Sequence, residues 1–244
     1  MRPPDPDPAS RTAALVPARD EEESLPGLLE GLARAGLGSA LVVDNGSSDG
    51  TAAAARAGGA EVVREPRPGY GRACRAGLEA LAARAEPPRW VVFVDADDGL
   101  APGQVPRLLA PLASGRAELV IGARRAAAGC GAGRSPVPLH ARLGNRLVAA
   151  VLRGVYGAAA TDPGPFRAAP LGALLDLGLD DPDYGWNVQM QVRALRAGWR
   201  VREVPVAFRG RTAGRSTISG SVRGSARAGV RMLATLAAEM ARPP

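Results

Sequence analysis

WVVFVDADDGL, residues Trp90 to Leu100, is the stretch from which the rest of the chain is interpreted. Apolar residues run from Trp90 to Val94 and meet Asp95, Asp97 and Asp98, with Gly99 directly after them. Two like charges about 4 Å apart repel by roughly 1 kcal/mol in water and about 4 kcal/mol near a protein surface. A cation relieves that repulsion, so the stretch predicts a buried strand that ends at a cation site.

Apolar segments alternate with helix-forming segments on both sides of this stretch. Short apolar strands that alternate with helices are typical of an α/β protein with a parallel sheet covered on both faces. Expected strands lie at 13–18, 40–44, 60–65, 89–95, 117–124 and 199–208, with a short strand within 161–170. Expected helices lie at 24–35 with Ser24 as the cap, from Asp49 or Thr51 onward, and at 72–85, 102–113, 139–153, 185–197 and 218–240.

No linker or internal repeat divides the chain. The sequence predicts a disordered tail at 1–11, one domain at 12–217 and a basic amphipathic helix within 218–244. In open α/β sheets the ligand lies at the carboxyl ends of the strands. Polar residues follow the expected strands at that edge, namely Arg19 to Glu21, Asp44 with Asn45, Glu65, Asp95 with Asp97, and Arg124.

Asp95 and Asp97 are the candidate metal ligands. Mg²⁺ and Mn²⁺ prefer oxygen ligands, and Mg²⁺ commonly binds one or two carboxylates together with substrate phosphates. The alternative is a solvated turn that caps the next helix. The position at the end of a buried strand favours the metal site.

The composition and charge of the chain favour some classes of binding partner over others. The net charge is +7. The segment from Arg200 to Arg231 contains eight Arg and only one acidic residue, Glu203. Such a field favours phosphates or anionic lipid, whereas 4% aromatic residues and no recognition motif argue against nucleic acid. No run approaches a membrane span and the N-terminus has no signal-peptide core. We expect a cytoplasmic protein, with peripheral contact at the cytoplasmic membrane face as an alternative.

Several motifs in order resemble family 2 glycosyltransferases of the GT-A fold, whose mostly parallel, Rossmann-like sheet is flanked by helices in a single domain. They are LVPARDEEESL (15–25), LVVDNGSSDGT (41–51), GYGRACRAGL (69–78), VVFVDADDG (91–99), LVIGARR (119–125), GNRL (144–147), TDPGPFRA (161–168), YGWNVQMQVRALRAGWRVREVPV (184–206) and RTAGRSTISGS (211–221). The later motifs are most similar to the dolichyl-phosphate mannosyltransferase and polyprenyl-phosphate glycosyltransferase branch.

The resemblance implies a metal-dependent, inverting transfer of a sugar from a nucleoside-diphosphate sugar to a polyprenyl phosphate or other phosphate-bearing acceptor. Asp95 and Asp97 match its metal motif, and Asp97 and Asp162 are the implied catalytic residues. The implied nucleotide-binding residues are Pro17, Ala18, Arg19, Glu21, Asp44, Gly71, Arg72, Asp95 and Ala96. The implied phosphate- or acceptor-binding residues are Arg124, Trp186, Arg211, Arg215 and Ser216.

Three positions depart from the family pattern. Gly99 stands where the lipid-phosphate branch often has Gln, and Thr217 replaces a Lys. Gln189 stands where many relatives have Glu, and Gln is no general base. Asp162 and Asp183 remain as candidate bases. Because an ionised phosphate needs no base, Gln189 together with the Arg-rich C-terminal region favours a phosphate acceptor.

Two alternatives stay open. Gln189 and Thr217 are compatible with a nucleotide-sugar-binding module that has lost catalysis. A phosphatase or phosphotransferase also uses two aspartates after a strand, but the motif of that enzyme class has Thr or Val at the position of Gly99. The terminal helix likewise has two interpretations, a surface helix on anionic membrane or a helix that packs on its own core.

Overall fold

The computed structural model describes residues 7–97, 102–126, 139–157, 164–208 and 222–242, and one seven-stranded sheet organises them. Strand order is β3-β2-β1-β4-β6-β5-β7. The strands are β1 Thr12–Ala18, β2 Ser39–Asp44, β3 Glu61–Arg64, β4 Trp90–Phe93, β5 Leu119–Ala126, β6 Arg167–Pro170 and β7 Val201–Phe208. β6 is antiparallel to both of its neighbours, β4 and β5, whereas the other described pairs are parallel.

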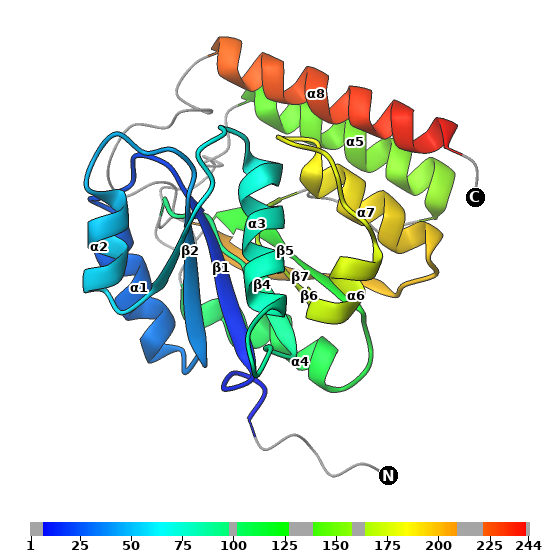
Figure 1. Ribbon diagram of the computed structural model, residues 1–244. Helices are drawn as coiled ribbons and strands as arrows, with labels where there is room; N and C mark the ends of the chain where they lie inside the picture. The colour runs from blue at the N-terminus through cyan, green and yellow to red at the C-terminus, as the bar shows by residue number, and fades with distance from the viewer. Residues whose placement is uncertain (1–6, 98–101, 127–138, 158–163, 209–221, 243–244) are drawn as a thin grey trace.

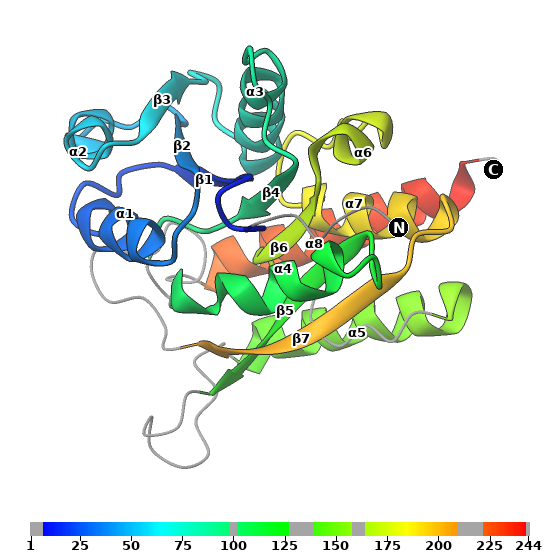
Figure 2. The same cartoon turned by 90° about the horizontal axis from the view of Figure 1, so that it is seen from below.

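Helices cover both faces of this sheet (Figures 1 and 2). They are α1 Leu25–Arg34, α2 Thr51–Ala57, α3 Tyr70–Ala82, α4 Val105–Ala113, α5 Leu139–Tyr156, α6 Leu171–Asp176, α7 Trp186–Arg196 and α8 Val222–Ala241, with a 3₁₀ turn η1 Pro102–Gln104. Along β1, Ala14 and Val16 pack in the core with α1 and α4, whereas Leu15 packs on the opposite side with α3 and α7. The alternation explains why the strand is apolar throughout: both of its faces are buried.

α5 and α8 form a further layer beside α7 (Figure 1). Val148 and Leu152 of α5, Val188 and Val192 of α7 and Leu236 of α8 make a third core cluster. On α8, Leu236 is buried and Leu233 is partly buried against this cluster, but Val230 is 67% exposed and Met240 is 44% exposed. The helix therefore packs on its own molecule through part of its apolar side and leaves Val230 and Met240 exposed.

Local structure differs from expectation at three places. β4 ends at Phe93 rather than at Asp95, although the Val94 amide still donates to the Leu15 carbonyl oxygen at 3.0 Å. Ser24 precedes α1 but does not cap it, because its hydroxyl donates to Glu21 instead. The short helix α6 was not expected.

Within the described residues, no helix combines the length and the apolar character that crossing a bilayer requires.

Candidate functional site

The strand register brings the predicted residues of β1, β2 and β4 to one edge of the sheet. Ala18 at the end of β1 lies opposite Asp44 at the end of β2. Phe93 of β4 lies opposite Leu15 of β1, so Asp95 follows at the level of Pro17. Because these strands are parallel neighbours, their carboxyl ends share one edge, as the sequence predicts.

Asp44 and Asn45 are both buried at this edge. The Asp44 carboxylate accepts a hydrogen bond from the Ser47 amide at 2.9 Å, which holds the following turn. The Asn45 side chain donates to the carbonyl oxygens of Glu65 and Arg67 and accepts from the Gly69 amide at 2.8 Å. Asn45 thus ties the end of β2 to the loop that leads into α3.

Acidic side chains of the first loop bind the second loop. Asp20, which has a φ of 54°, accepts from the Ser48 amide at 2.8 Å, and Glu22 accepts from the Gly50 amide at 2.7 Å. These carboxylates therefore satisfy backbone donors and fix the two loops against each other. Of the two predicted nucleotide-binding residues in this loop, Arg19 is exposed, and the Glu21 carboxylate accepts from the Ser24 hydroxyl at 2.7 Å.

The first turn of α3 packs tightly against the loop that precedes α7. A Cβ on Gly71 would lie 1.9 Å from the carbonyl oxygen of Asp181, so only glycine fits there. The Arg72 amide donates to the Pro182 carbonyl oxygen at 3.1 Å, and its guanidinium donates to the Pro68 carbonyl oxygen at 2.7 Å. Gly71 and Arg72, both predicted to bind nucleotide, thus also hold two loops together.

Asp95 and Asp97 are partly exposed, and Ala96 between them is buried. In the part of the chain that the structure describes, no group of three or more His, Cys, Asp or Glu side chains is placed to hold a metal. Two carboxylates at a sheet edge suit a hard cation whose remaining ligands are substrate phosphates and water. The donor set therefore fits the predicted metal, for which Asp95 and Asp97 would be the protein ligands.

A buried cluster lies beneath Asp95. Burial raises the pKa of the Tyr70 hydroxyl well above its ordinary value, and the negative charge of Asp95 raises it further. Arg167 acts in the opposite direction, and the Asn187 side chain lies beside the hydroxyl. Burial likewise raises the pKa of the Cys74 thiol, which the Asp95 charge also raises and the Arg167 charge lowers.

Two expectations about α7 need correction. Trp186, expected to contact the acceptor, is 1% exposed and packs in the core with α3 and the sheet. Gln189, on the opposite side of the helix from Asn187, accepts from the Asp180 and Asp181 amides at 2.8 and 2.9 Å and donates to Glu239 at 2.9 Å. Because Gln189 faces α8, its identity does not bear on a general base, and the inference of a phosphate acceptor from this residue does not hold.

The remaining predicted residues divide into two groups. Arg124 lies on β5 opposite Val206 of β7 and is partly buried. Asp162, Arg211, Arg215 and Ser216 lie outside the described residues. Asp183, the other candidate base, accepts from the Tyr70 amide at 3.4 Å.

Sequence reasoning missed Tyr70, Arg167 and Asn187. One signal was available for Arg167, because it interrupts the apolar run of an expected buried strand. Nothing comparable marks Tyr70 or Asn187, whose roles depend on α3 and α7 meeting at the sheet.

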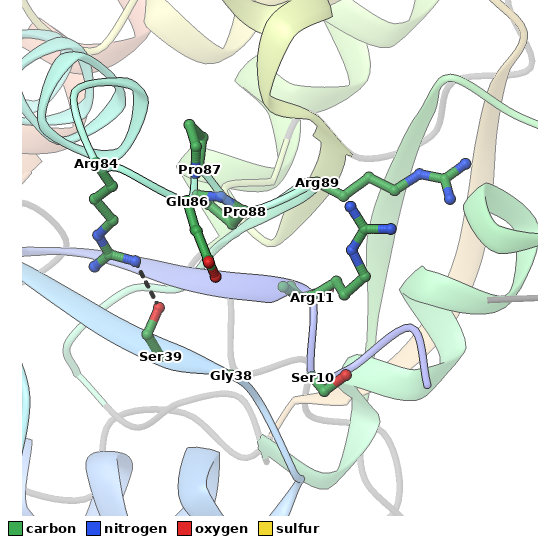
Figure 3. A pocket seen from close by; sticks show the side chains of 10 residues that line it. Ser10, Arg11, Gly38, Ser39, Arg84, Glu86, Pro87, Pro88 and Arg89 are labelled. Atoms are coloured by element: carbon green, nitrogen blue, oxygen red, sulfur yellow. Dashed lines mark hydrogen bonds between the residues drawn. The ribbon is translucent and has the colours of Figure 1, made fainter. Parts of the chain in front are cut away.

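A cavity of about 470 Å³ lies at the opposite, amino edge of the sheet (Figure 3). Arg84 points toward Ser39 there and its guanidinium donates to the Ser39 hydroxyl at 2.8 Å, while Arg11 and Arg89 extend along the other side. Arg89 also lies over the Trp90 ring, 4.4 Å from its centroid. The register separates this cavity from Asp95 by the length of β4.

One protein family and several known proteins are similar to this chain. The model of the family described as Glycosyl transferase family 2 matches residues 13–168, which include Asp44, Asp95 and Asp97. An uncharacterized glycosyltransferase of Mycobacterium tuberculosis (strain ATCC 25618 / H37Rv) is 44% identical over 211 residues, which cover 86% of this chain and 91% of the relative. An undecaprenyl-phosphate mannosyltransferase of Micrococcus luteus is 34% identical over 227 residues, covering 88% of this chain and 90% of the relative.

A solved structure extends the likeness to the fold. Glucosyl-3-phosphoglycerate synthase from Mycobacterium tuberculosis, in complex with Mn²⁺, uridine diphosphate and phosphoglyceric acid, has a TM-score of 0.72. It is 26% identical, and the likeness covers 96% of this chain and 79% of that protein.

Proposed function

Because the chain belongs to glycosyl transferase family 2 and has the GT-A fold, we propose that it moves a sugar, with inversion, from a nucleoside-diphosphate sugar to a phosphate-bearing acceptor, most simply a polyprenyl phosphate. The observation that carries the proposal is the placement of Asp95 and Asp97 at the same sheet edge as Asp44. One half of that edge can bind a base and the other half a diphosphate.

Each residue has a chemical task in this proposal. Asp44 accepts a hydrogen bond from a ring N–H of the base, and the loops around Pro17 and Gly71 enclose the nucleoside. Asp95 and Asp97 would hold Mg²⁺ or Mn²⁺, which neutralises charge on the departing nucleoside diphosphate when bound. Arg124 and Arg211 present guanidinium forks, whose geometry suits phosphate oxygens.

The acceptor class is supported by the relatives and by charge. The Micrococcus luteus relative is named for a lipid phosphate, and the solved neighbour holds phosphoglyceric acid, so both involve a phosphate. The concentration of Arg between residues 200 and 231 fits an anionic acceptor. A phosphate monoester is ionised near neutral pH and attacks without a general base, whereas a hydroxyl acceptor would require one, with Asp162 as the candidate.

Donor binding is tested by thermal shift with UDP-, GDP- and dTDP-sugars, each with and without Mn²⁺. A ligand at 100 times its Kd stabilises the native state by about 2.7 kcal/mol, so the cognate donor should raise Tm only when the metal is present. Asp97→Ala should abolish this metal-dependent shift and sugar transfer. Asp176→Ala, an exposed aspartate on α6, is the matched control and should retain both.

The acceptor is tested next with the cognate donor. Transfer to a short-chain polyprenyl phosphate, but not to the corresponding polyprenol, supports the proposal. Transfer to phosphoglycerate alone would identify a small soluble phosphate instead of a lipid. Tight donor binding with no transfer to any phosphate would favour the non-catalytic binding module.

A further inference from the structure

Arg167 is a charged side chain with no exposed surface. It lies on β6, opposite Phe93 of β4 and Ile121 of β5, in the middle of the sheet, and its relative exposure is 0%. A buried charge is strongly unfavourable unless hydrogen bonds and an opposite charge compensate it, and arginine is almost never wholly buried without them. The fold therefore gives this guanidinium specific partners.

Two of those partners belong to segments of the proposed site. Nε of Arg167 donates to the Gly164 carbonyl oxygen at 2.7 Å, and Nη1 donates to the Asn187 carbonyl oxygen at 2.6 Å. Gly164 directly follows the stretch that contains Asp162. Asn187 lies in the first turn of α7 and places its side chain beside the Tyr70 hydroxyl.

Arg167 also lies in the same part of the sheet as Asp95. Phe93 and Arg167 are cross-strand partners at the last residue of β4, and Asp95 follows Phe93 by two residues. Phe93, Tyr70 and Cys74 all lie on the α3 side of the sheet. Asp95 and Arg167 act with opposite signs on the pKa values of both Tyr70 and Cys74, so both charges lie near the same two groups.

We propose that Arg167 is a positioning residue of the transferase site: its guanidinium fork holds the Gly164 backbone and the first turn of α7 in a fixed relation to Asp95. The inference deepens the proposed function and rests on it for its catalytic consequence. A planar guanidinium can direct separate N–H groups at two carbonyl oxygens, whereas a lysine ammonium is a compact point charge. Lysine at this position would keep the charge but not both anchors.

The test compares Arg167→Met and Arg167→Lys with wild type by hydrogen exchange and kinetics. Arg75→Met, on an exposed arginine of α3, is the control. In Arg167→Met, amide exchange in 164–170 and 184–191 should accelerate about tenfold or more, while β2 and β3 keep wild-type protection. A misplacement of about 1 Å caused by a mutation far from the reacting atoms can lower activity by roughly 100-fold. We expect this loss in kcat, with donor KM changed less than about threefold, because the contacts of Asp44 are untouched.

Arg167→Lys keeps the charge and so provides a folded variant if Arg167→Met does not fold. It should loosen one of the two anchored segments and restore part of kcat. Wild-type exchange in both segments, or a uniform loss of protection across the whole sheet, would overturn the inference in favour of plain core packing. If wild type transfers no sugar, the proposed function fails, and the exchange data still decide whether Arg167 anchors these segments.

Discussion

Single residues at the carboxyl edge are constrained by backbone contact as much as by chemistry, and Gly71 is the sharpest case. An added methyl group would meet the Asp181 carbonyl oxygen, which belongs to another loop and cannot rotate away. We expect Gly71→Ala to destabilise the protein by about 1 to 3 kcal/mol, as overpacking does. The urea midpoint of unfolding measures this change.

Gly154→Ala is the matched control for that substitution. Gly154 lies in the last turn of α5 and has nothing within 4 Å of an added Cβ. The same change there should stabilise by roughly 1 kcal/mol, through helix propensity alone. Equal effects at the two positions would show that α3 does not depend on close packing against the Asp181 loop.

Among the elements, α8 is joined to α7 by a buried polar network centred on Glu239. Glu239 accepts from Gln189 at 2.9 Å and from Arg193 at 2.8 and 3.0 Å. Burial alone would raise the pKa of this carboxyl, but the hydrogen bonds and the Arg193 charge outweigh it and lower the pKa below 4.5. A lowered pKa means that the network stabilises the fold above about pH 4.5 and that this contribution is lost as pH falls through the folded-state pKa.

Glu239→Gln should therefore lower stability at pH 7, by about 3 kcal/mol if it behaves as a buried pair that has lost one partner. It should also flatten the fall in unfolding free energy as the pH decreases below about 4.5, as measured by urea denaturation. Some dependence of the unfolding free energy on pH will remain, because the pKa of Asp180 is lowered too. Burial would raise the pKa of this carboxyl, but hydrogen bonds from Gln189 and Arg242 and the Arg193 charge outweigh it. An unchanged slope would contradict this role for Glu239.

On the scale of the whole molecule, the α5–α7–α8 layer completes the hydrophobic core. Removing residues 222–244 would uncover Val188 and Val192 and take away the Thr235 hydroxyl, which donates to Asp181 at 2.7 Å. We expect a chain that ends at residue 221 to lose its cooperative thermal transition and to aggregate. Circular dichroism melting with size-exclusion chromatography checks this. A cooperative melt close to that of the full chain would mean that α8 is a dispensable addition.

Most of the sheet, and the convergence of Asp44 and Asp95 at its carboxyl edge, were predictable from local pattern. Wholly apolar strands indicated a sheet buried on both faces, and residues directly after β1, β2 and β4 converge because parallel neighbours end at one edge. The prediction failed where a role depends on which side of a helix meets which partner. Trp186 and Gln189 were expected at the site from motif position alone, but one lies in the core and the other faces α8.

The order of the elements and the chemistry available at strand ends can therefore be read from the chain alone, since both follow from periodicity and from residue type over short distances. Three features depend on how the elements pack: Asn187 rather than Gln189 faces Tyr70, Arg167 joins Gly164 to α7, and α8 packs through Leu236, Thr235 and Glu239. These contacts join residues between 3 and more than 100 positions apart. Their geometry is set by how whole elements pack, which no local pattern encodes.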